Sequence, residues 1–481
     1  MIVNKFSSSA LLLLLSPIFL LAQQPCNCEG NFKWVKETFE KNDAGFDYAI
    51  QQKGMAAYQQ HNKDILAKIK KTTDKEQCAV VMREWLQFFR KGHHAIIPVY
   101  ATPAAGTATT ATVSETPEIL SLSEEQVKQQ VPDVSNPSLE GIWTTSSYKI
   151  GIVKKDKGYK GVILTSGNQA WKPGYVKLNI AADSAGTFYM GDFSANKFAK
   201  AILIGKNTLQ LGNVFLNRIY PAFEGDDKAA VLYAKEMATS VPFLQQLSDK
   251  TILFRIPTFE DYAKHDIDSL LKVNDVLLKR TPNLVIDIRD NGGGSDVSYY
   301  GIIPLLYTNP IRSINTTFLS TPLNNSRMEG FLATPGISEA EKKELTEAVK
   351  MLKENPGKFV NLNKGKTVQV EKLDTIFPFP KNVAIIIDNG NGSTSEEFLL
   401  AAKQSKKVKL FGVTTFGVLD ISNTYVVESP DKQFKLGYSL SKSLRIPDLA
   451  IDGKGIMPDY YIDKSIPDAQ WVNYVVGILE Q

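Results

Sequence analysis

The segment of residues 383–417 is the part of this chain that most restricts how it folds. An apolar stretch, Val383–Ile387, runs through a tight Asp-Asn-Gly-Asn-Gly turn into residues 393–398, which open a helix with the sequence Ser-Thr-Ser-Glu-Glu-Phe. A serine on a sharp turn between a strand and a helix has an exposed hydroxyl, and the N–H groups and positive dipole at the helix start stabilise negative charge beside it. The segment therefore predicts a nucleophile at Ser393.

A glycine-rich loop upstream supplies a second element of this kind. The predicted strand Leu284–Ile288 leads directly into Arg289-Asp290-Asn291-Gly292-Gly293-Gly294. Consecutive glycines leave backbone N–H groups unshielded, and such groups stabilise the charge that develops on an oxygen during acyl transfer. Together the two elements predict a serine nucleophile that faces an oxyanion-binding loop.

Each element also has a plainer interpretation. Ser393 and Glu396 have the spacing of a helix capping box, in which the serine accepts a hydrogen bond from a backbone N–H and the glutamate reaches back to another. The glycine loop has the composition of an ordinary turn or of a phosphate cradle. The phosphate interpretation is disfavoured because no Gly-Lys-Ser/Thr follows and because Val297 stands where a dinucleotide fingerprint has a small residue.

Length and composition indicate a multidomain globular protein. A chain of 481 residues is long enough for about two to four domains, and its contents of 43% hydrophobic and 22% charged residues are globular values. The net charge of +4 is nearly balanced, and no Lys/Arg cluster is interleaved with aromatic residues, so we expect no nucleic-acid partner. The short basic run Lys403–Lys409 is typical of a solvated helix end.

The first residues are typical of a processing segment. Lys5 precedes the apolar stretch Ala10–Ala22, which is shorter than the roughly 20 residues that span a bilayer. We predict a signal peptide at residues 1–22, no transmembrane segment in the mature chain, and export to the periplasm or the extracellular space. The three cysteines are Cys26, Cys28 and Cys78. Export favours one disulfide between Cys78 and one of the other two, whereas the spacing does not fit zinc, so we expect no metal.

The rest of the chain divides into four stretches. Residues 23–100 carry apolar side chains at helical spacing and predict a small helical domain, and residues 101–138 begin with small residues that predict a linker. Residues 139–222 contain short alternating apolar runs broken by Gly, Asn and Asp, which predict a small all-β, barrel-like domain with Trp143 and Trp171 in its core. Residues 245–481 alternate strands and helices, with an insertion at 310–378. The predicted strands are Thr251–Ile256, Leu284–Ile288, Val383–Ile387 and Val408–Phe411, and the predicted helices are Phe259–Lys279, Val297–Leu306 and Ser395–Ser405. The expected fold class is thus multidomain α+β.

The order of the motifs resembles the C-terminal-processing (tail-specific) serine peptidases. The resemblance covers residues 245–463 and depends on four segments: Ile286–Gly294, Asn391–Phe398, Gly412–Gly417 and Gly453–Asp459. It implies a crotonase-like catalytic domain of stacked ββα units, a peptide or protein substrate, and Ser393 as the attacking serine.

One residue departs from the commonest pattern of that family. The usual members have a lysine base twenty-five positions after the serine, and Val418 occupies that position here. The sequence Gly92-His93-His94-Ala95-Ile96 is similar to the Gly-His-x-x-Ile of the family's tricorn-like branch, which uses a histidine base. The resemblance therefore assigns the base to His93, with His94 as the alternative because only the motif register separates them. His61 and His265 are interpreted as surface residues.

A histidine base needs a carboxylate that holds its tautomer and stabilises the imidazolium. The tricorn-like branch has a glutamate near its closing motif, and Asp452 is the matching acid here, although it is shorter by one methylene and is also a typical turn residue before glycine. The branch has a serine before its histidine, where this chain has Gly92. Backbone N–H groups of Gly293 and Thr394 are the expected oxyanion donors.

These observations predict an exported serine endopeptidase. Ser393, His93 and Asp452 would form an acyl-enzyme that water releases, with no metal or organic cofactor. Residues 139–222 lack a Gly-Leu-Gly-type carboxylate-binding loop, so recognition of substrate C-termini is not supported. The alternative is a catalytically inactive relative that binds a peptide or an apolar ligand. The sequence does not specify the oligomeric state.

Overall fold

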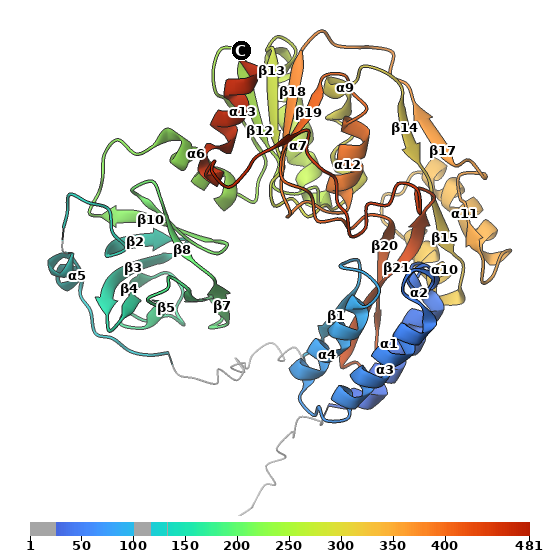
Figure 1. The fold of residues 1–481 in the computed structure, drawn as a ribbon, viewed down its shortest axis with the longest axis horizontal. Helices are drawn as coiled ribbons and strands as arrows, with labels where there is room; N and C mark the ends of the chain where they lie inside the picture. The colour runs from blue at the N-terminus through green and yellow to red at the C-terminus, as the bar shows by residue number, and fades with distance from the viewer. Residues whose placement is uncertain (1–25, 101–116, 132) are drawn as a thin grey trace, which may run out of the picture.

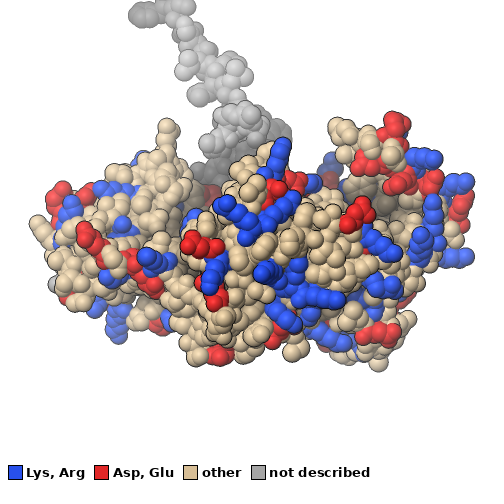
Figure 2. Space-filling view, turned by 90° about the horizontal axis from the view of Figure 1, so that it is seen from above, with Lys and Arg blue, Asp and Glu red and all other residues tan. Residues whose placement is uncertain are grey.

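The computed structural model describes residues 26–100, 117–131 and 133–481, so the predicted signal peptide lies outside the described residues. Figure 1 shows three parts: an N-terminal helical unit, a separate β module and a parallel sheet covered by helices. Within the described ranges, no helix combines the length and apolar character needed to cross a membrane. The face in Figure 2 carries interspersed acidic and basic side chains.

The helical unit contains the expected helices. They are α1 (Cys28–Asn42), α2 (Phe46–Lys53), α3 (Met55–Ile69) and α4 (Lys75–Gln87). Trp85 is fully buried and packs edge-to-face against Phe32 and Phe39, with ring centroids 5.7 and 5.6 Å apart. The predicted disulfide joins Cys28 to Cys78 and thereby fastens α1 to α4. Cys26 is the unpaired cysteine.

The helical unit does not have a core of its own. Strand β1 (Ala95–Pro98) pairs antiparallel with β21 (Phe434–Ser443), and four β21 side chains are buried in the same cluster as the helices: Phe434, Leu436, Tyr438 and Leu440. The apolar stripes of the helices thus cover one face of a C-terminal strand, as layered packing requires. The four helices, β1 and β21 therefore form one structural unit, in which residues 93–98 lie beside residues 420–440.

The β module is a nine-stranded antiparallel sheet with the order β7-β6-β5-β4-β3-β2-β10-β9-β8. Its strands are β2 (Gly141–Thr145), β3 (Tyr148–Lys155), β4 (Gly158–Ser166), β5 (Val176–Ile180), β6 (Gly186–Tyr189), β7 (Ala195–Phe198), β8 (Ala201–Ile204), β9 (Thr208–Leu211) and β10 (Val214–Tyr220). The two ends of the sheet, β7 and β8, follow one another in sequence, and both contribute to one core with Trp143 and Trp171. The sheet is therefore curled nearly closed, in agreement with the barrel-like prediction.

The predicted linker 101–138 contains a helix that the prediction did not include. Helix α5 (Glu124–Gln130) begins with a capping box of Ser123 and Gln126. Its Val127 is fully buried against β2 and β3, so this part of the predicted linker belongs to the β module.

The parallel sheet carries Ser393 at the end of one of its strands. Its order is β11 (Phe243–Gln246), β12 (Thr251–Arg255), β13 (Asn283–Asp287), β18 (Asn382–Ile387), β19 (Val408–Gly412) and β22 (Tyr460–Tyr461), with only β11 antiparallel. Its central strands are buried on both faces, which explains their nearly continuous apolar sequences. Helices α7 (Asp261–Val273) and α12 (Thr394–Ala402) cover one face, and α13 (Trp471–Leu479) covers the other.

The insertion 310–378 contains regular helices and strands, one of which pairs with a strand of the C-terminal part. It contains β14 (Ile311–Ile314), β15 (Thr316–Leu319), α10 (Pro322–Phe331), α11 (Glu339–Lys353), β16 (Phe359–Val360) and β17 (Val368–Glu371). Strand β15 pairs with β21, so the insertion extends the sheet that also holds β1 and β20 (Ile421–Glu428). The continuous helix expected at Val297–Leu306 is wrong. Only short turns form there, η1 (Asp296–Ser298) and α9 (Ile303–Leu306), because Gly301 and Pro304 interrupt the segment.

Candidate active site

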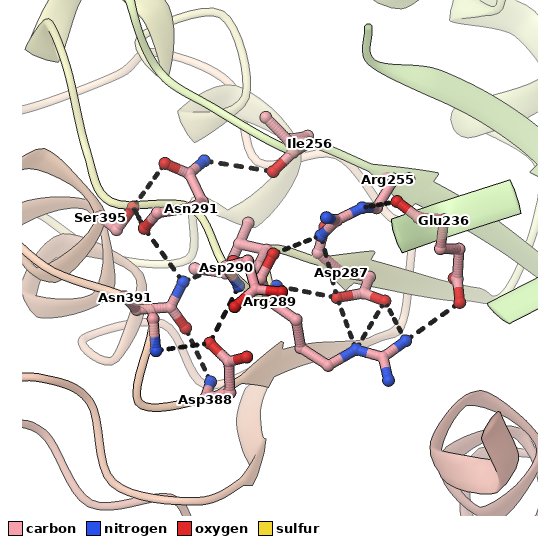
Figure 3. A network of polar contacts seen from close by, with 12 residues as sticks. Glu236, Arg255, Ile256, Asp287, Arg289, Asp290, Asn291, Asp388, Asn391 and Ser395 are labelled. Atoms are coloured by element: carbon pink, nitrogen blue, oxygen red, sulfur yellow. Dashed lines mark hydrogen bonds and ion pairs between the residues drawn. The ribbon is translucent and has the colours of Figure 1, made fainter. Parts of the chain in front are cut away.

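Ser393 lies on the tight turn between β18 and α12. Its φ of 56° and ψ of −125° are uncommon for a residue other than glycine, and such backbone conformations concentrate at functional sites. The turn is held by Asn391, whose Oδ1 accepts from the Asp388 N–H at 2.8 Å and whose Nδ2 donates to the carbonyls of Ile288 and Asn291. Figure 3 shows how this side chain joins the serine turn to the glycine loop.

The capping-box interpretation of Ser393 is wrong. The serine side chain makes no capping hydrogen bond to α12. The Glu396 carboxylate instead accepts from the Thr415 hydroxyl and from the N–H groups of Gly417 and Val418, at 2.5, 2.9 and 2.9 Å. The glutamate thus fixes the segment that follows β19, and the serine hydroxyl is available for another partner.

That partner is His93, which lies 300 positions away in sequence. The His93 Nε2 is 3.0 Å from the Ser393 Oγ, and the His93 Nδ1 is 2.6 Å from the carbonyl oxygen of Ile421. A carbonyl oxygen only accepts hydrogen bonds, so Nδ1 carries the ring proton and Nε2 accepts from the serine hydroxyl. This is the tautomer that a general base needs in order to activate a serine.

The backbone of His93 is fixed by a buried ion pair. Arg90 donates to the carbonyls of Gly92 and His93, at 3.0 Å each, and makes two hydrogen bonds to Asp43 at 2.8 and 2.6 Å. The Ser439 hydroxyl also donates to the His93 carbonyl at 3.0 Å. These contacts hold His93 at a φ of 56°, a left-handed conformation that histidine seldom adopts without support.

His94 points elsewhere. Its Nε2 is 2.8 Å from the carbonyl oxygen of Arg90, so the structure brings His93 and not His94 to the serine. The pKa of His93 is lowered to about 4, chiefly by burial, while the hydrogen bond to the Ile421 carbonyl acts in the opposite direction and the charge of Arg90 adds to the lowering. His93 is therefore neutral near pH 7.

Asp452 does not take the place expected for it. Its Oδ1 accepts from the N–H groups of Leu419 and Asp420 at 2.5 and 2.7 Å, while the carbonyl of Ile421 is the partner of the His93 Nδ1. Burial raises the pKa of Asp452, which the two N–H donors partly offset. The structure therefore joins Ser393 to His93 and leaves the predicted acid one backbone segment away.

The two departures from the family pattern lie against each other. A Cβ added at Gly92 would meet both methyl carbons of Val418 at 3.1 Å. Val418 stands where the commoner members have their lysine, and Gly92 stands where the tricorn-like branch has a serine. The valine side chain thus lies against Gly92, and a side chain at position 92 would press on it.

The glycine loop packs directly on Ser393. A Cβ at Gly293 would lie 2.9 Å from both the Ser393 Cβ and the Thr394 nitrogen, and the residue has a φ of 108°, so glycine is needed on both grounds. Of the two predicted oxyanion donors, the Thr394 N–H begins α12 and has no acceptor among the described residues. The Gly293 N–H instead donates to the Asn291 Oδ1 at 3.0 Å.

A buried charged network supports the start of this loop. Arg289 hydrogen-bonds to both oxygens of Asp287 and pairs with Glu236 of α6 (Lys228–Ala238) at 3.0 Å, while Arg255 donates to the Arg289 carbonyl at 2.7 Å (Figure 3). Burial raises the pKa of Glu236 to about 8. No sequence motif points to this network, because Glu236 belongs to no motif and is distant from the loop in sequence.

A cavity of about 1090 Å³ opens over the serine and the histidine. Its walls come from the glycine loop, α12, β20 and the insertion, including Asp296, Tyr300, Ile311, Phe331, Glu371 and Arg445. A cavity of this size accommodates several residues of an extended chain. The insertion therefore forms part of the wall of this cavity. Among the described residues, no group of three or more His, Cys, Asp or Glu side chains is arranged to hold a metal ion.

Ser393 stands at the start of a helix, next to a glycine loop, and its hydroxyl faces a neutral histidine. This arrangement is typical of the serine hydrolases. The model of peptidase family S41 matches residues 250–462, somewhat less than half of the chain, and this part of the chain is similar to that family. The match contains Ser393 and the glycine loop. His93 lies outside it.

Curated relatives match a smaller part of the chain. A probable CtpA-like serine protease from Staphylococcus aureus (strain COL) is 31% identical over 164 residues, which are 29% of this chain and 31% of that protein. The same values hold for the protein of strain N315. The chain thus matches less than a third of the length of these relatives.

Solved structures resemble the chain in fold. The crystal structure of a CPAF mutant gives a TM-score of 0.50 at 12% sequence identity and covers 94% of this chain and 97% of that one. At this identity the likeness concerns the fold alone. The crystal structure of the tricorn protease gives a TM-score of 0.41 at 10% identity over 94% of this chain and 37% of that one, a likeness too weak to carry an argument.

Proposed function

We propose that this protein is an exported serine endopeptidase of the tricorn-like kind, with Ser393 as nucleophile and His93 as general base. The observation that carries the proposal is the 3.0 Å contact between the Ser393 Oγ and an unprotonated His93 Nε2. His93 takes the hydroxyl proton as Ser393 attacks the carbonyl carbon of the substrate. The resulting imidazolium then donates that proton to the leaving amine, and an acyl-enzyme remains.

The Thr394 N–H is the donor best placed to receive the oxyanion. It lies next to the nucleophile and has no competing acceptor among the described residues. The Gly293 N–H serves as a second donor if the Asn291 side chain releases it when substrate binds. One such donor is typically worth about 3 kcal/mol of the barrier.

Export is supported by the disulfide. Structural disulfides form and persist in oxidising compartments, and Cys28–Cys78 joins two helices of the unit that supplies His93. The processing signal that we predict precedes these residues directly in sequence. The crotonase-like arrangement of the parallel sheet likewise belongs to this proposal, as does the assignment to the tricorn-like branch.

A fluorophosphonate probe tests the proposal because it reacts with an activated serine and needs no known substrate. We expect the wild type to be labelled at pH 8 and Ser393→Ala to be unlabelled. Ser326→Ala is the matched control, since this serine is exposed on α10 and bonds only to the Leu323 carbonyl. Absence of labelling in the folded wild type between pH 6 and pH 9 would favour the alternative, a binding protein for a peptide or an apolar ligand.

A further inference from the structure

Two loops beside the active site hold each other through their carboxylates. The Asp452 Oδ1 accepts from the N–H groups of Leu419 and Asp420, at 2.5 and 2.7 Å. The Asp420 Oδ2 accepts from the N–H groups of Ile451 and Asp452, at 2.6 and 2.8 Å. Hydrogen bonds with a charged acceptor are short and strong, so the four bonds fix the two loops relative to each other.

The same clamp is tied to the helix of the nucleophile. The Asp420 Oδ1 accepts from the Arg445 Nε at 3.0 Å, and the Arg445 Nη1 lies 3.2 Å from the Glu397 Oε2 on α12. The Glu397 N–H in turn donates to the Ser393 carbonyl at 3.1 Å. Asp420 and Arg445 are almost completely buried, which keeps this connection free of solvent competition.

The clamp ends one peptide away from the base. Ile421 follows Asp420 directly, and its carbonyl accepts from the His93 Nδ1 at 2.6 Å. Ile421 also begins β20, where it pairs with Lys442 of β21. The direction of the Ile421 carbonyl is therefore set on one side by the sheet and on the other side by the Asp452 carboxylate.

We propose that Asp452 is a positioning residue that acts on His93 through the backbone of Leu419–Ile421. Its carboxylate holds the segment, and the Ile421 carbonyl then keeps the ring proton on Nδ1 and the bare Nε2 toward Ser393. The role requires an oxygen that accepts two N–H groups, and it does not require a negative charge. This inference rests on the proposed function for its catalytic meaning, but the tautomer of His93 tests it separately.

Positioning of His93 and charge stabilisation of its imidazolium require different properties of residue 452. A carboxylate in direct contact with the histidine holds the ring tautomer and stabilises the imidazolium by its charge, and replacing it by an amide costs about 10⁴-fold in the serine proteases that use this arrangement. An asparagine at position 452 keeps an Oδ1 that can accept from both N–H groups and removes only the charge. An alanine removes the acceptor as well. The two substitutions therefore separate positioning from charge stabilisation.

The experiment compares Asp452→Asn and Asp452→Ala with Asp463→Ala, a control whose carboxylate accepts from the Ser465 N–H at 2.8 Å on an exposed turn. The first readout is the rate constant of fluorophosphonate labelling at pH 8. We expect Asp452→Asn to stay within about 10-fold of wild type and Asp452→Ala to fall by about 100-fold, the effect of misplacing a catalytic group by about 1 Å. The control should equal wild type.

The second readout is the ¹⁵N chemical shift pair of the His93 ring. We expect wild type and Asp452→Asn to show the proton on Nδ1, and Asp452→Ala to show a mixture of tautomers.

Labelling of Asp452→Asn that falls as far as that of Asp452→Ala overturns the inference, and so does a folded Asp452→Ala with wild-type labelling and tautomer. If Asp452→Ala does not fold, the Asn variant decides, since a loss near 10⁴-fold shows that charge is required. If the wild type is not labelled, the proposed function fails, while an unchanged tautomer in Asp452→Ala would refute the inference independently.

Discussion

The two halves of the active site are built in different ways. Ser393 is fixed by residues close to it in sequence, because β18, the glycine turn and α12 follow one another within residues 382–402. His93 is fixed by groups from distant segments, namely Asp43 through Arg90, the Ser439 hydroxyl and the Ile421 carbonyl. The nucleophile half is thus a local motif, whereas the base half exists only when the N-terminal helices are packed on β21.

The difference predicts that substitutions in the two halves affect activity and stability in different ways. A change in the nucleophile half alters the chemistry directly, since the groups that it contains touch the reacting atoms. A change in the supports of the base half acts through the placement of one imidazole ring, so its effect should be smaller and should be accompanied by a loss of stability.

Removal of the base itself should have the largest effect. We expect His93→Ala to lower the rate of fluorophosphonate labelling by roughly 10⁴- to 10⁶-fold, because an unactivated serine hydroxyl is a weak nucleophile. Labelling kinetics at pH 8 measure this loss. His265→Ala is the matched control, since this histidine is exposed on α7. A His93→Ala protein that reacts like wild type would show that another group activates the serine.

A methyl group in the glycine loop should have the next largest effect. Gly293→Ala places a Cβ within 2.9 Å of the Ser393 Cβ and the Thr394 nitrogen, at a φ of 108°, so the nucleophile and the oxyanion donor must move. We expect labelling to fall by about 10²- to 10³-fold, the range seen when an oxyanion donor is lost.

The neighbouring glycine offers a control for this substitution. A Cβ at Gly292 would meet no atom within 4 Å, and its φ lies outside the left-handed region, so Gly292→Ala should react at close to the wild-type rate. Equal losses in the two variants would mean that the loop tolerates no side chain at all, and that packing on Ser393 is not the cause.

Loss of the support for the base should have a smaller effect on reactivity and a clear effect on stability. Asp43→Ala leaves the Arg90 guanidinium buried without its partner, and breaking a buried pair in this way typically costs about 3–5 kcal/mol of unfolding free energy. We expect a lower Tm and a fall in labelling of about 100-fold from misplacement of His93. Thermal unfolding and labelling kinetics check both effects. Asp47→Ala, on the exposed side of α2 (Phe46–Lys53), is the control.

The sequence was sufficient for the local half of the site and for the sheet that carries it. Strands β12, β13, β18 and β19 lie within one residue of their predicted positions, since buried parallel strands leave continuous apolar runs. Strand β7 has the sequence Ala-Asn-Lys-Phe, in which no apolar alternation marks a strand. The curled β sheet and the two core tryptophans followed from the short alternating runs and their turns.

The supports of the base could not be predicted in the same way. The partner of the His93 Nδ1 is a backbone carbonyl, and every residue has one, so no residue type at position 421 signals this role. Asp452 was chosen by its place in a motif, but its carboxylate is held by two backbone N–H groups that only the folded loops bring to it. Long-range hydrogen bonds of this kind leave no periodicity in the sequence.

The central claim is that a buried, neutral His93 meets the Ser393 hydroxyl, and an NMR titration of the His93 ring tests it most directly. Burial places the pKa at about 4, so the ring should remain neutral from pH 8 down to about pH 5, and the labelling rate should decline only as the pH falls through the folded-state pKa. Because the unfolded chain binds this proton near pH 6.5, acidification between pH 6.5 and 4 should also lower the free energy of unfolding. The account would be contradicted if the His93 ring of the folded protein titrated near pH 6.5 and the labelling rate did not change as the ring became protonated.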